Sequence, residues 1–276
     1  MKKFIASFWA ICYIAIYFVC IFGASFFFAL LRPESVLPDG SIRESDRAIF
    51  YIALCVIISL AALLILKLRR KSLRAGLPMR RLSLSQISRL IIVGVGLGFA
   101  MPLITGMLPI PEEIIREYEE LVKTSVIGDT TFLGVIATVV LAPLNEELVF
   151  RAGVFGELDK VGVPLALFAQ SLVFALIHGN TYQVISVFPA AIVLGLVYRW
   201  TDNLLASLLV HVVVNGQSTL YAYFLSGAPI SSPAGIQAFT LVVAASVIGL
   251  FYALRSLYRD YKREPSEPHG GFDERI

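Results

Sequence analysis

The feature that most constrains this chain is a series of about eight apolar runs, each long enough to cross a lipid bilayer as a helix. A transmembrane helix needs roughly 20 mainly apolar residues. The runs lie near residues 4–31, 48–66, 88–108, 130–155, 162–179, 183–199, 203–224 and 236–257. The chain is 57% hydrophobic and 16% charged, whereas soluble domains have about 45–50% apolar and 25% charged residues. We therefore expect an all-α polytopic membrane protein, and the composition excludes an ordinary soluble domain.

Clustered positive charges predict how these helices are oriented. Residues 67–89 contain eight lysines and arginines and no acidic residue, and the flank that begins at Arg255 is also basic. By the positive-inside rule both segments face the cytoplasm. Eight crossings then place both termini in the cytoplasm, which agrees with Lys2 and Lys3. We expect membrane lipid as a partner of the basic loop and no nucleic-acid partner.

The runs and the segments between them suggest four regions. Residues 1–108 form an N-terminal region of three membrane helices, and residues 130–257 form the catalytic membrane core. Residues 109–129 are rich in glutamate and carry apolar residues at helical spacing, which predicts an amphipathic helix on the outer interface. Residues 258–276 are expected to be a disordered cytoplasmic tail. Gly94 and Gly98 form a GxxxG pattern, which favours close helix packing.

Ionisable residues at membrane depth are the best candidates for function, because each costs at least ~2.5 kcal/mol at the centre of a membrane helix. The run before residue 155 carries Glu146, Glu147 and Arg151. Glu147 and Arg151 are four residues apart and can pair on one helix face. Glu146 is rotated by about 100° and needs a different partner. A purely structural clasp remains an open interpretation of the Glu147–Arg151 pair.

Two histidines occupy later runs that are otherwise free of charge. His178 is the only Asp, Glu, Lys, Arg or His between residues 161 and 198, and His211 is the only one between 203 and 254. Each has a companion at a spacing of four residues, Phe174 before His178 and Asn215 after His211. The fourth, fifth and seventh helices would therefore bring their side chains to one site inside the bundle.

This set of residues suits hydrolysis. A carboxylate in an apolar site has a raised proton affinity and can act as a base for water. A neutral imidazole can orient that water, and a second histidine with an amide can donate hydrogen bonds to an oxyanion. The same groups could instead bind zinc through Glu146, His178 and His211, which is a familiar ligand set with an open position. The residues alone leave these two routes open.

Three motifs in this order resemble the CPBP family of intramembrane proteases, which contains the CAAX prenyl endopeptidases and bacterial relatives tied to bacteriocin self-immunity. Glu146-Glu147-Leu-Val-Phe-Arg151 matches EExxxR, Phe174-Ala-Leu-Ile-His178 matches FxxxH, and His211-Val-Val-Val-Asn215 matches HxxxN. The resemblance covers about residues 130–220, and the first three spans show none.

The resemblance implies a membrane hydrolase that cuts a membrane-associated peptide or protein. Glu146 would activate water with help from His178, and His211 with Asn215 would stabilise the oxyanion. Glu147, Arg151 and Phe174 would shape the site or contact the substrate. The family has been described both as zinc-dependent and as metal-free, and the absence of an HExxH motif favours the metal-free mechanism. The compact chain suggests the plasma membrane of a prokaryote.

The depths of the motifs raise one geometric question. A fourth helix that began at residue 130 would place Glu146 roughly 24 Å from the outer face, which is too deep to meet His178. A helix that begins outside the bilayer and continues through Gly156 brings Glu146 toward mid-depth. We therefore predict a long fourth helix and a water-filled cavity that opens to the cytoplasm.

Two other functions compete with proteolysis. A non-proteolytic immunity or scaffold protein could keep the fold without using Glu146. A transporter could use Glu146 or Glu147 as a proton site, but the chain shows no inverted repeat and no pair of broken helices.

Overall fold

The structure is a computed structural model, and it describes residues 2–38, 40–69, 76–124, 131–224 and 232–263. These residues form helices and no β-strand, with a single isolated bridge between Val36 and Ile42. The elements are α1 (Lys2–Leu31), η1 (Pro33–Ser35), α2 (Glu44–Leu68), α4 (Leu84–Gly106), α5 (Glu112–Thr124), α6 (Phe132–Ile136), η3 (Ala137–Leu141), α7 (Ala142–Glu146), η4 (Glu147–Phe155), α8 (Gly156–Leu158), α9 (Val163–Leu176), α10 (Thr181–Thr201), α11 (Leu204–Phe224) and α12 (Pro233–Arg263). The prediction of an all-α membrane protein is confirmed.

Within the described ranges, seven helices are long and apolar enough to cross a membrane, one fewer than the sequence predicts. The difference lies in the run 162–179, where α9 has only 14 residues. At 1.5 Å per residue α9 is about 21 Å long, shorter than a hydrocarbon core of about 30 Å. The chain leaves the helix after Leu176 and enters a turn that contains His178 and Gly179.

The described helices divide into two compact units that interleave in the sequence. Unit 1 contains residues 1–79 and 121–170, and unit 2 contains residues 80–120 and 171–266. This division differs from the contiguous regions 1–108 and 130–257. The reason is that α4 packs against α11 and α12, whereas the span that holds Glu146 packs against α1 and α2.

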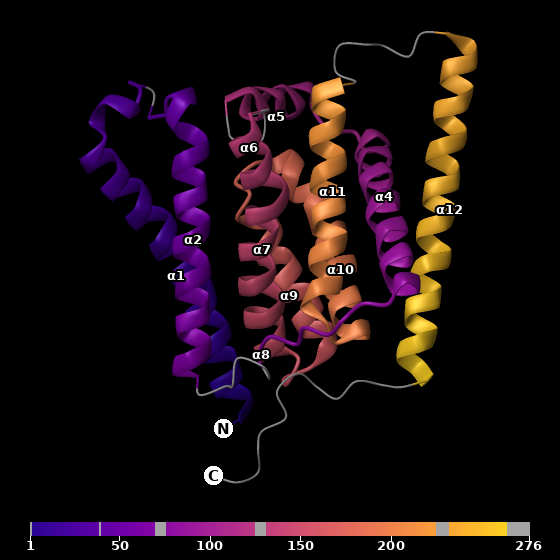
Figure 1. The fold of residues 1–276 in the computed structure, drawn as a ribbon, viewed down its shortest axis with the longest axis horizontal. Coiled ribbons are helices and arrows are strands. Elements are labelled where there is room, and N and C mark those ends of the chain that lie inside the picture. Colours follow the sequence, from indigo (N-terminus) through magenta and orange to yellow (C-terminus); the bar gives the residue numbers. More distant parts are fainter. Residues whose placement is uncertain (1, 39, 70–75, 125–130, 225–231, 264–276) are drawn as a thin grey trace. The chain divides into compact units, whose positions relative to one another are not determined.

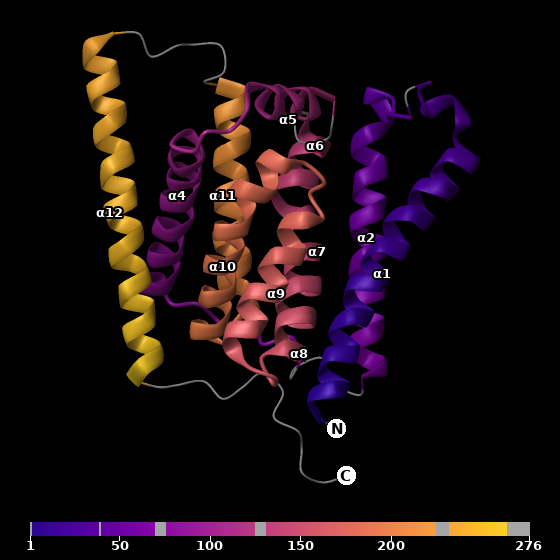
Figure 2. The same ribbon diagram turned by 180° about the vertical axis from the view of Figure 1, so that it is seen from behind.

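Unit 1 is built around the span Phe132–Leu158, with α1 and α2 beside it. Figure 1 shows α1 and α2 close together at one end and diverging toward the loop that joins them, and Figure 2 shows the same from behind. Where they diverge, they line an apolar groove of about 430 Å³ that includes Gly23, Phe28 and Phe50. The Phe28 and Phe50 rings meet there at 4.8 Å between centroids.

The predicted long fourth helix is confirmed, and it is continuous from Phe132 to Leu158. It is not a uniform α-helix, because η3 and η4 are π-helical. Pro143 stands in the first turn of α7. A proline has no N–H and clashes with the carbonyl four residues before it, and the wider turns of η3 accommodate this defect. No proline or other local sequence signal accounts for η4.

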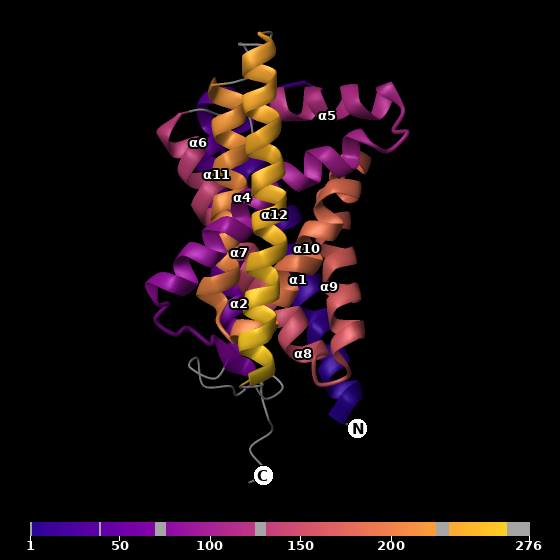
Figure 3. The ribbon, with the colours of Figure 1, turned by 90° about the vertical axis from the view of Figure 1, so that its right-hand side faces the viewer.

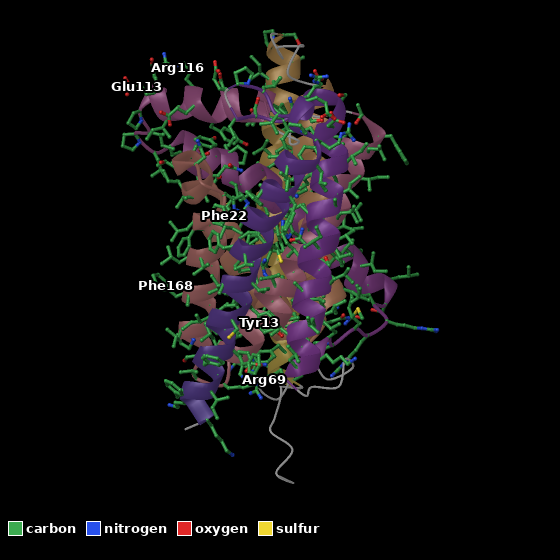
Figure 4. All side chains as sticks on the ribbon, turned by 90° about the vertical axis from the view of Figure 1, so that its left-hand side faces the viewer. Tyr13, Phe22, Arg69, Glu113, Arg116 and Phe168 are labelled. Carbon is green, nitrogen blue, oxygen red and sulfur yellow. The ribbon has the colours of Figure 1, made fainter. Side chains whose placement is uncertain are left out.

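One end of unit 1 is held by buried charge. Glu157 is fully buried and pairs with Lys160 at 2.7 Å and with Arg69 at 3.4 Å. The Arg69 guanidinium also lies 5.6 Å from the ring centroid of Trp9. Figure 4 shows Tyr13 and Arg69 near this same end, with Phe22 farther along α1. These contacts join the start of α1 to the ends of α2 and α8.

In unit 2 the glycines of α4 let three helices approach closely (Figure 3). A Cβ atom on Gly94 would lie 2.7 Å from Val213 of α11, and one on Gly98 would lie 2.6 Å from Gln217. A Cβ atom on Gly96 would lie 2.5 Å from Leu250 of α12. The GxxxG prediction of close packing is confirmed, and α4 is wedged between α11 and α12.

The two ends of unit 2 differ in charge. At one end Arg80 pairs with Asp202 at 2.5 Å, Arg89 pairs with Asp260 at 2.5 Å, and Arg199 lies over the Tyr261 ring. Arg80 and Arg89 of the basic segment therefore lie at the same end of this unit as the basic end of α12.

At the opposite end of unit 2 the acidic helix α5 lies across the bundle (Figure 3). The Tyr118 ring of α5 stacks on Tyr182 at 4.6 Å, and the Tyr182 hydroxyl is 3.1 Å from Thr105 at the end of α4. Burial and the neighbouring Tyr182 raise the pKa of Tyr118. The predicted amphipathic helix is therefore present, although it ends at Thr124 and residues 125–129 lie outside the described residues.

The C-terminal boundary also differs from the expectation. α12 continues to Arg263, so residues 258–263 are helical where a disordered tail was expected to begin. Tyr258 and Tyr261 explain the extension, because they pack against Trp200 and Arg199. The rest of the expected tail, residues 264–276, lies outside the described residues.

Candidate functional site

The EExxxR residues lie on the long span in unit 1, where α7 ends at Glu146 and the π-helical η4 begins at Glu147. Glu147 and Arg151 are both fully buried, and Arg151 Nη1 lies 3.0 Å from Glu147 Oε1. The predicted pairing of these two side chains is therefore confirmed. Glu146 is the last residue of α7 and is only 8% exposed. Glu147 is thus the carboxylate in the ion pair with Arg151, and Glu146 lies beside this pair.

The other neighbours of Glu146 in unit 1 come from α1 and α2. Asn145 is 3% exposed, and its side chain hydrogen-bonds with the thiol of Cys55. Phe150, which follows Glu146 in the chain, contacts Tyr17 edge-on, with 5.6 Å between the two ring centroids. Helices that show no family motif therefore form the walls around the candidate base.

The FxxxH and HxxxN residues meet in unit 2 around one buried ring. Phe174 is 2% exposed, and its ring contacts the rings of His178 and His211 edge-on, at 5.1 Å and 5.9 Å between centroids. Phe174 therefore contacts both imidazoles. This contact brings together two histidines that are 33 positions apart in the chain.

The hydrogen bond of His178 defines which ring nitrogen is available. His178 Nδ1 lies 2.8 Å from the backbone carbonyl oxygen of Phe174. A carbonyl oxygen can only accept, so Nδ1 carries the proton and donates it. In the neutral ring Nε2 is then the acceptor, which is the form that can accept a hydrogen bond from a water molecule.

His211 and Asn215 are placed by the packing of α11. His211 is buried next to Val210, and Asn215 is half-buried one turn later. Gly94 of α4 packs against Val210 and Val213 of the same helix. At the start of α11, the Asn203 side chain accepts from the backbone N–H of Leu205 and of Arg80, and donates to the Arg80 carbonyl. Both contacts fix the height and rotation of the helix that carries the HxxxN motif.

The structure thus assembles the predicted residues in two sets. Glu146, Glu147 and Arg151 belong to unit 1, and the set around Phe174 belongs to unit 2. Each set has a defined internal geometry, and a single site made from both remains a proposal.

The zinc alternative gains no support from the described part of the chain. Among those residues, no three His, Cys, Asp or Glu side chains gather as metal ligands would. The proposed zinc set would need Glu146 from unit 1 together with His178 and His211 from unit 2.

Sequence reasoning missed the polar residues that face Glu146 from α1 and α2. Cys55 stands in an apolar run, is 2% exposed and contacts the polar side chain of Asn145. A signal was present, because Tyr17 stands near the middle of the first apolar run, whereas membrane tyrosines usually lie in belts at the two interfaces.

A comparison with protein families matches residues 128–217, about a third of the chain, to the family described as type II CAAX prenyl endopeptidase Rce1-like. The chain is 36% identical over 85 residues to the membrane-embedded CAAX protease MroQ of Staphylococcus aureus (strain USA300), which covers 28% of this chain and 34% of that protein. It is 32% identical over 77 residues to the UPF0177 protein YxdF of Lactococcus lactis subsp. lactis (strain IL1403), which covers 28% of this chain and 42% of that protein.

The matches to the two relatives span less than half the length of either one, and the family match over residues 128–217 contains the three motifs. No solved structure matches the chain.

Proposed function

We propose that this chain is an intramembrane endopeptidase of the CAAX-protease type that cuts a membrane-associated peptide or protein. The match of residues 128–217 to the type II CAAX prenyl endopeptidase Rce1-like family supports this proposal. The observation that carries the proposal is the difference between the two glutamates of the EExxxR motif. Arg151 is paired with Glu147, and the adjacent Glu146 is buried beside this pair. A buried carboxylate beside a separate ion pair is the arrangement that a general base requires.

In the proposed reaction, the Glu146 carboxylate takes a proton from a water molecule as the water oxygen attacks the carbonyl carbon of the scissile peptide bond. The Nε2 atom of His178 accepts a hydrogen bond from the same water and holds it in place, consistent with the proton on Nδ1. When the C–N bond breaks, Glu146 returns the proton to the leaving amine. General base catalysis of this kind contributes about 10²–10⁴-fold to the rate.

The carbonyl oxygen becomes an oxyanion in this step and needs donors. His211 and Asn215, one turn apart on α11, supply a ring N–H and an amide N–H from the same side. Removal of one such donor typically lowers kcat by about 10²–10³-fold. The Glu147–Arg151 pair keeps the span that carries Glu146 in position. Phe174 keeps the imidazoles of His178 and His211 apart. The proposal requires the two sets of residues to share one water-accessible space.

We further propose that the protein lies in a prokaryotic plasma membrane with both termini in the cytoplasm. The support is the cluster of arginines at one end of unit 2 and the acidic helix α5 at the other. This orientation requires an even number of crossings, so α9 must complete a crossing despite its length of about 21 Å. A cysteine introduced at Asn180 should then react with a membrane-impermeant reagent from outside the cell, and a reaction from inside would contradict this topology.

The direct test is cleavage of a mixed pool of membrane-derived peptides, including CAAX-type ones, by the wild type and by Glu146→Gln in lipid nanodiscs. Mass spectrometry should find new termini with the wild type and at least 10²-fold fewer with the variant. Running both samples with a strong chelator separates zinc-assisted from glutamate-activated hydrolysis.

Glu34→Gln is the matched control, because it makes the same change at a carboxylate that is 57% exposed. It should cleave like the wild type. Equal cleavage by wild type and Glu146→Gln would overturn the proposal, and a wild type without cleavage would favour the non-proteolytic immunity or scaffold role.

A further inference from the structure

Two tyrosines from the motif-free α1 and α2 lie next to the candidate base, and the proposed function does not use them. Tyr17 is 9% exposed on α1, and Tyr51 is half-buried on α2. Both belong to unit 1, as does Glu146. A phenol inside a membrane protein needs a hydrogen-bond partner, because lipid offers none.

The geometry of the surrounding contacts places Tyr17 on the face of the helix that carries Glu146. Phe150 follows Glu146 by four residues, so the two side chains project from similar sides of the span. The Tyr17 ring meets the Phe150 ring at 5.6 Å. The phenol of Tyr17 is therefore held against the turn that presents the Glu146 carboxylate.

The contacts of α2 place Tyr51 in the same region. Cys55 contacts the side chain of Asn145, which directly precedes Glu146. Tyr51 is four residues before Cys55 and shares its helix face. Tyr17, Tyr51 and Cys55 all interact electrostatically with the Glu146 carboxylate. In unit 1 these three side chains therefore lie near the carboxylate, and Glu147 and Arg151 lie on its own helix.

We propose that Tyr17 and Tyr51 are positioning residues for Glu146, and that their hydroxyls hold its carboxylate, directly or through one water molecule, in the orientation that activates the attacking water. The α1–α2 pair is then part of the active site, although it lies outside the segment that matches the family. This inference rests on the proposed function, because it assigns Glu146 the role of base.

Tyr13 provides a matched control within the same helix. It lies one turn before Tyr17 on the same face of α1, it is fully buried, and it packs against Gly153. Its electrostatic partners are Glu157 and Arg69, and Glu146 is not among them. Its hydroxyl has no hydrogen-bond partner among the described residues. Tyr13→Phe therefore removes a buried hydroxyl of the same kind that does not face the base.

The experiment compares Tyr17→Phe, Tyr51→Phe and Tyr13→Phe in the peptide cleavage assay. The first two should lower kcat about tenfold each with KM unchanged, as expected for one lost hydrogen bond that acts on chemistry and not on binding. Tyr13→Phe should keep the wild-type kcat. Equal kcat values in all three variants, or losses confined to KM, would overturn the inference.

A second measurement separates the failure of this inference from failure of the proposed function. The infrared carboxylate band that disappears in Glu146→Gln should shift in Tyr17→Phe and Tyr51→Phe and stay in place in Tyr13→Phe, without any substrate. A shifted band with no cleavage would keep the tyrosines beside Glu146 and remove the protease. An unshifted band would remove the tyrosines from the site whatever the cleavage result.

Discussion

The span Phe132–Leu158 and the helix α12 are both long, apolar helices, yet they accommodate polar side chains in opposite ways. Half of the most apolar stretch of Phe132–Leu158 is buried inside the protein, against 6% for α12. The first holds Asn145, two glutamates of the EExxxR motif, Arg151 and Glu157 in its buried surface, whereas the buried residues of α12 are all apolar.

Two hydroxyl groups of α12 donate to carbonyl groups of their own helix. The hydroxyl of Thr240 donates to the carbonyl of Ile236 at 2.8 Å, and that of Ser246 donates to Val242 at 2.7 Å. A helix that faces lipid has no other partner to offer. Charged and amide groups are therefore retained only where protein has replaced lipid, and that is where a reaction with water can be housed.

The largest expected effect comes from breaking the buried ion pair. Arg151→Met should destabilise the protein by about 3–5 kcal/mol, because it leaves the fully buried Glu147 carboxylate without its counter-charge. Thermal unfolding in detergent would measure the loss. The double variant Glu147→Gln/Arg151→Met should recover most of it, because both charges of the pair are then removed together.

The exposed pair Arg32–Glu34 is the control for this prediction. Glu34→Gln should leave the unfolding temperature unchanged, because both side chains reach water. A double variant as unstable as Arg151→Met alone would mean that the loss comes from packing rather than from uncompensated charge.

A smaller effect is expected at the glycines of α4, which allow this helix to approach its neighbours closely. Gly94→Ala should destabilise unit 2 by about 1–3 kcal/mol, because the new Cβ would meet Val213 at 2.7 Å. Since Val213 lies between His211 and Asn215, cleavage should fall as well. Gly106→Ala adds a Cβ with nothing within 4 Å and should change neither quantity. Stability and cleavage equal to those of the wild type in Gly94→Ala would show that α4 and α11 are not in close contact.

The next prediction compares two asparagines that cap helices, one of which also forms hydrogen bonds to another segment. Asn180 caps α10 by accepting from the backbone N–H of Tyr182 and Gln183. Asn180→Ala should therefore lower stability by about 1 kcal/mol. Asn203→Ala removes the cap of α11 and also two hydrogen bonds to the backbone of Arg80, so its loss should be greater. Equal unfolding temperatures for the two variants would contradict the second role of Asn203.

The smallest effect is expected on the exposed face of α12. Thr240→Val exchanges a hydroxyl for a methyl group of similar size at an exposed position, where the hydroxyl is bonded to its own helix. The unfolding free energy should change by less than about 0.5 kcal/mol. A loss of the size expected for Arg151→Met would mean that this face is buried against something other than lipid.

The sequence predicted the helical class and the Glu147–Arg151 pair because both follow from local spacing. Apolar runs of about 20 residues and a charge pair at i and i+4 need no knowledge of the tertiary structure. The GxxxG of Gly94 and Gly98 was predictable for the same reason.

What the sequence did not predict depends on contacts between distant segments. The position of Tyr17 inside an apolar run indicates a polar group at membrane depth, but the sequence does not indicate that Tyr17 and Tyr51 lie near Glu146. That placement needs α1 and α2 to pack on one particular side of the span. The early end of α9 was also missed, since the apolar run continues through Ile177 and the turn begins only where the chain must present His178. The division into interleaved units follows from the packing of α4, which hydropathy does not encode.

The central claim is that the EExxxR set of unit 1 and the two histidines of unit 2 act on one water molecule. An experimental structure in lipid nanodiscs tests it most directly through the distances from the Glu146 carboxylate to His178 Nε2 and to the His211 ring. The account predicts that one water can bridge these groups, with separations of roughly 6 Å or less, in a space open to the cytoplasm. Separations more than twice as large, across packed side chains or lipid, would contradict it.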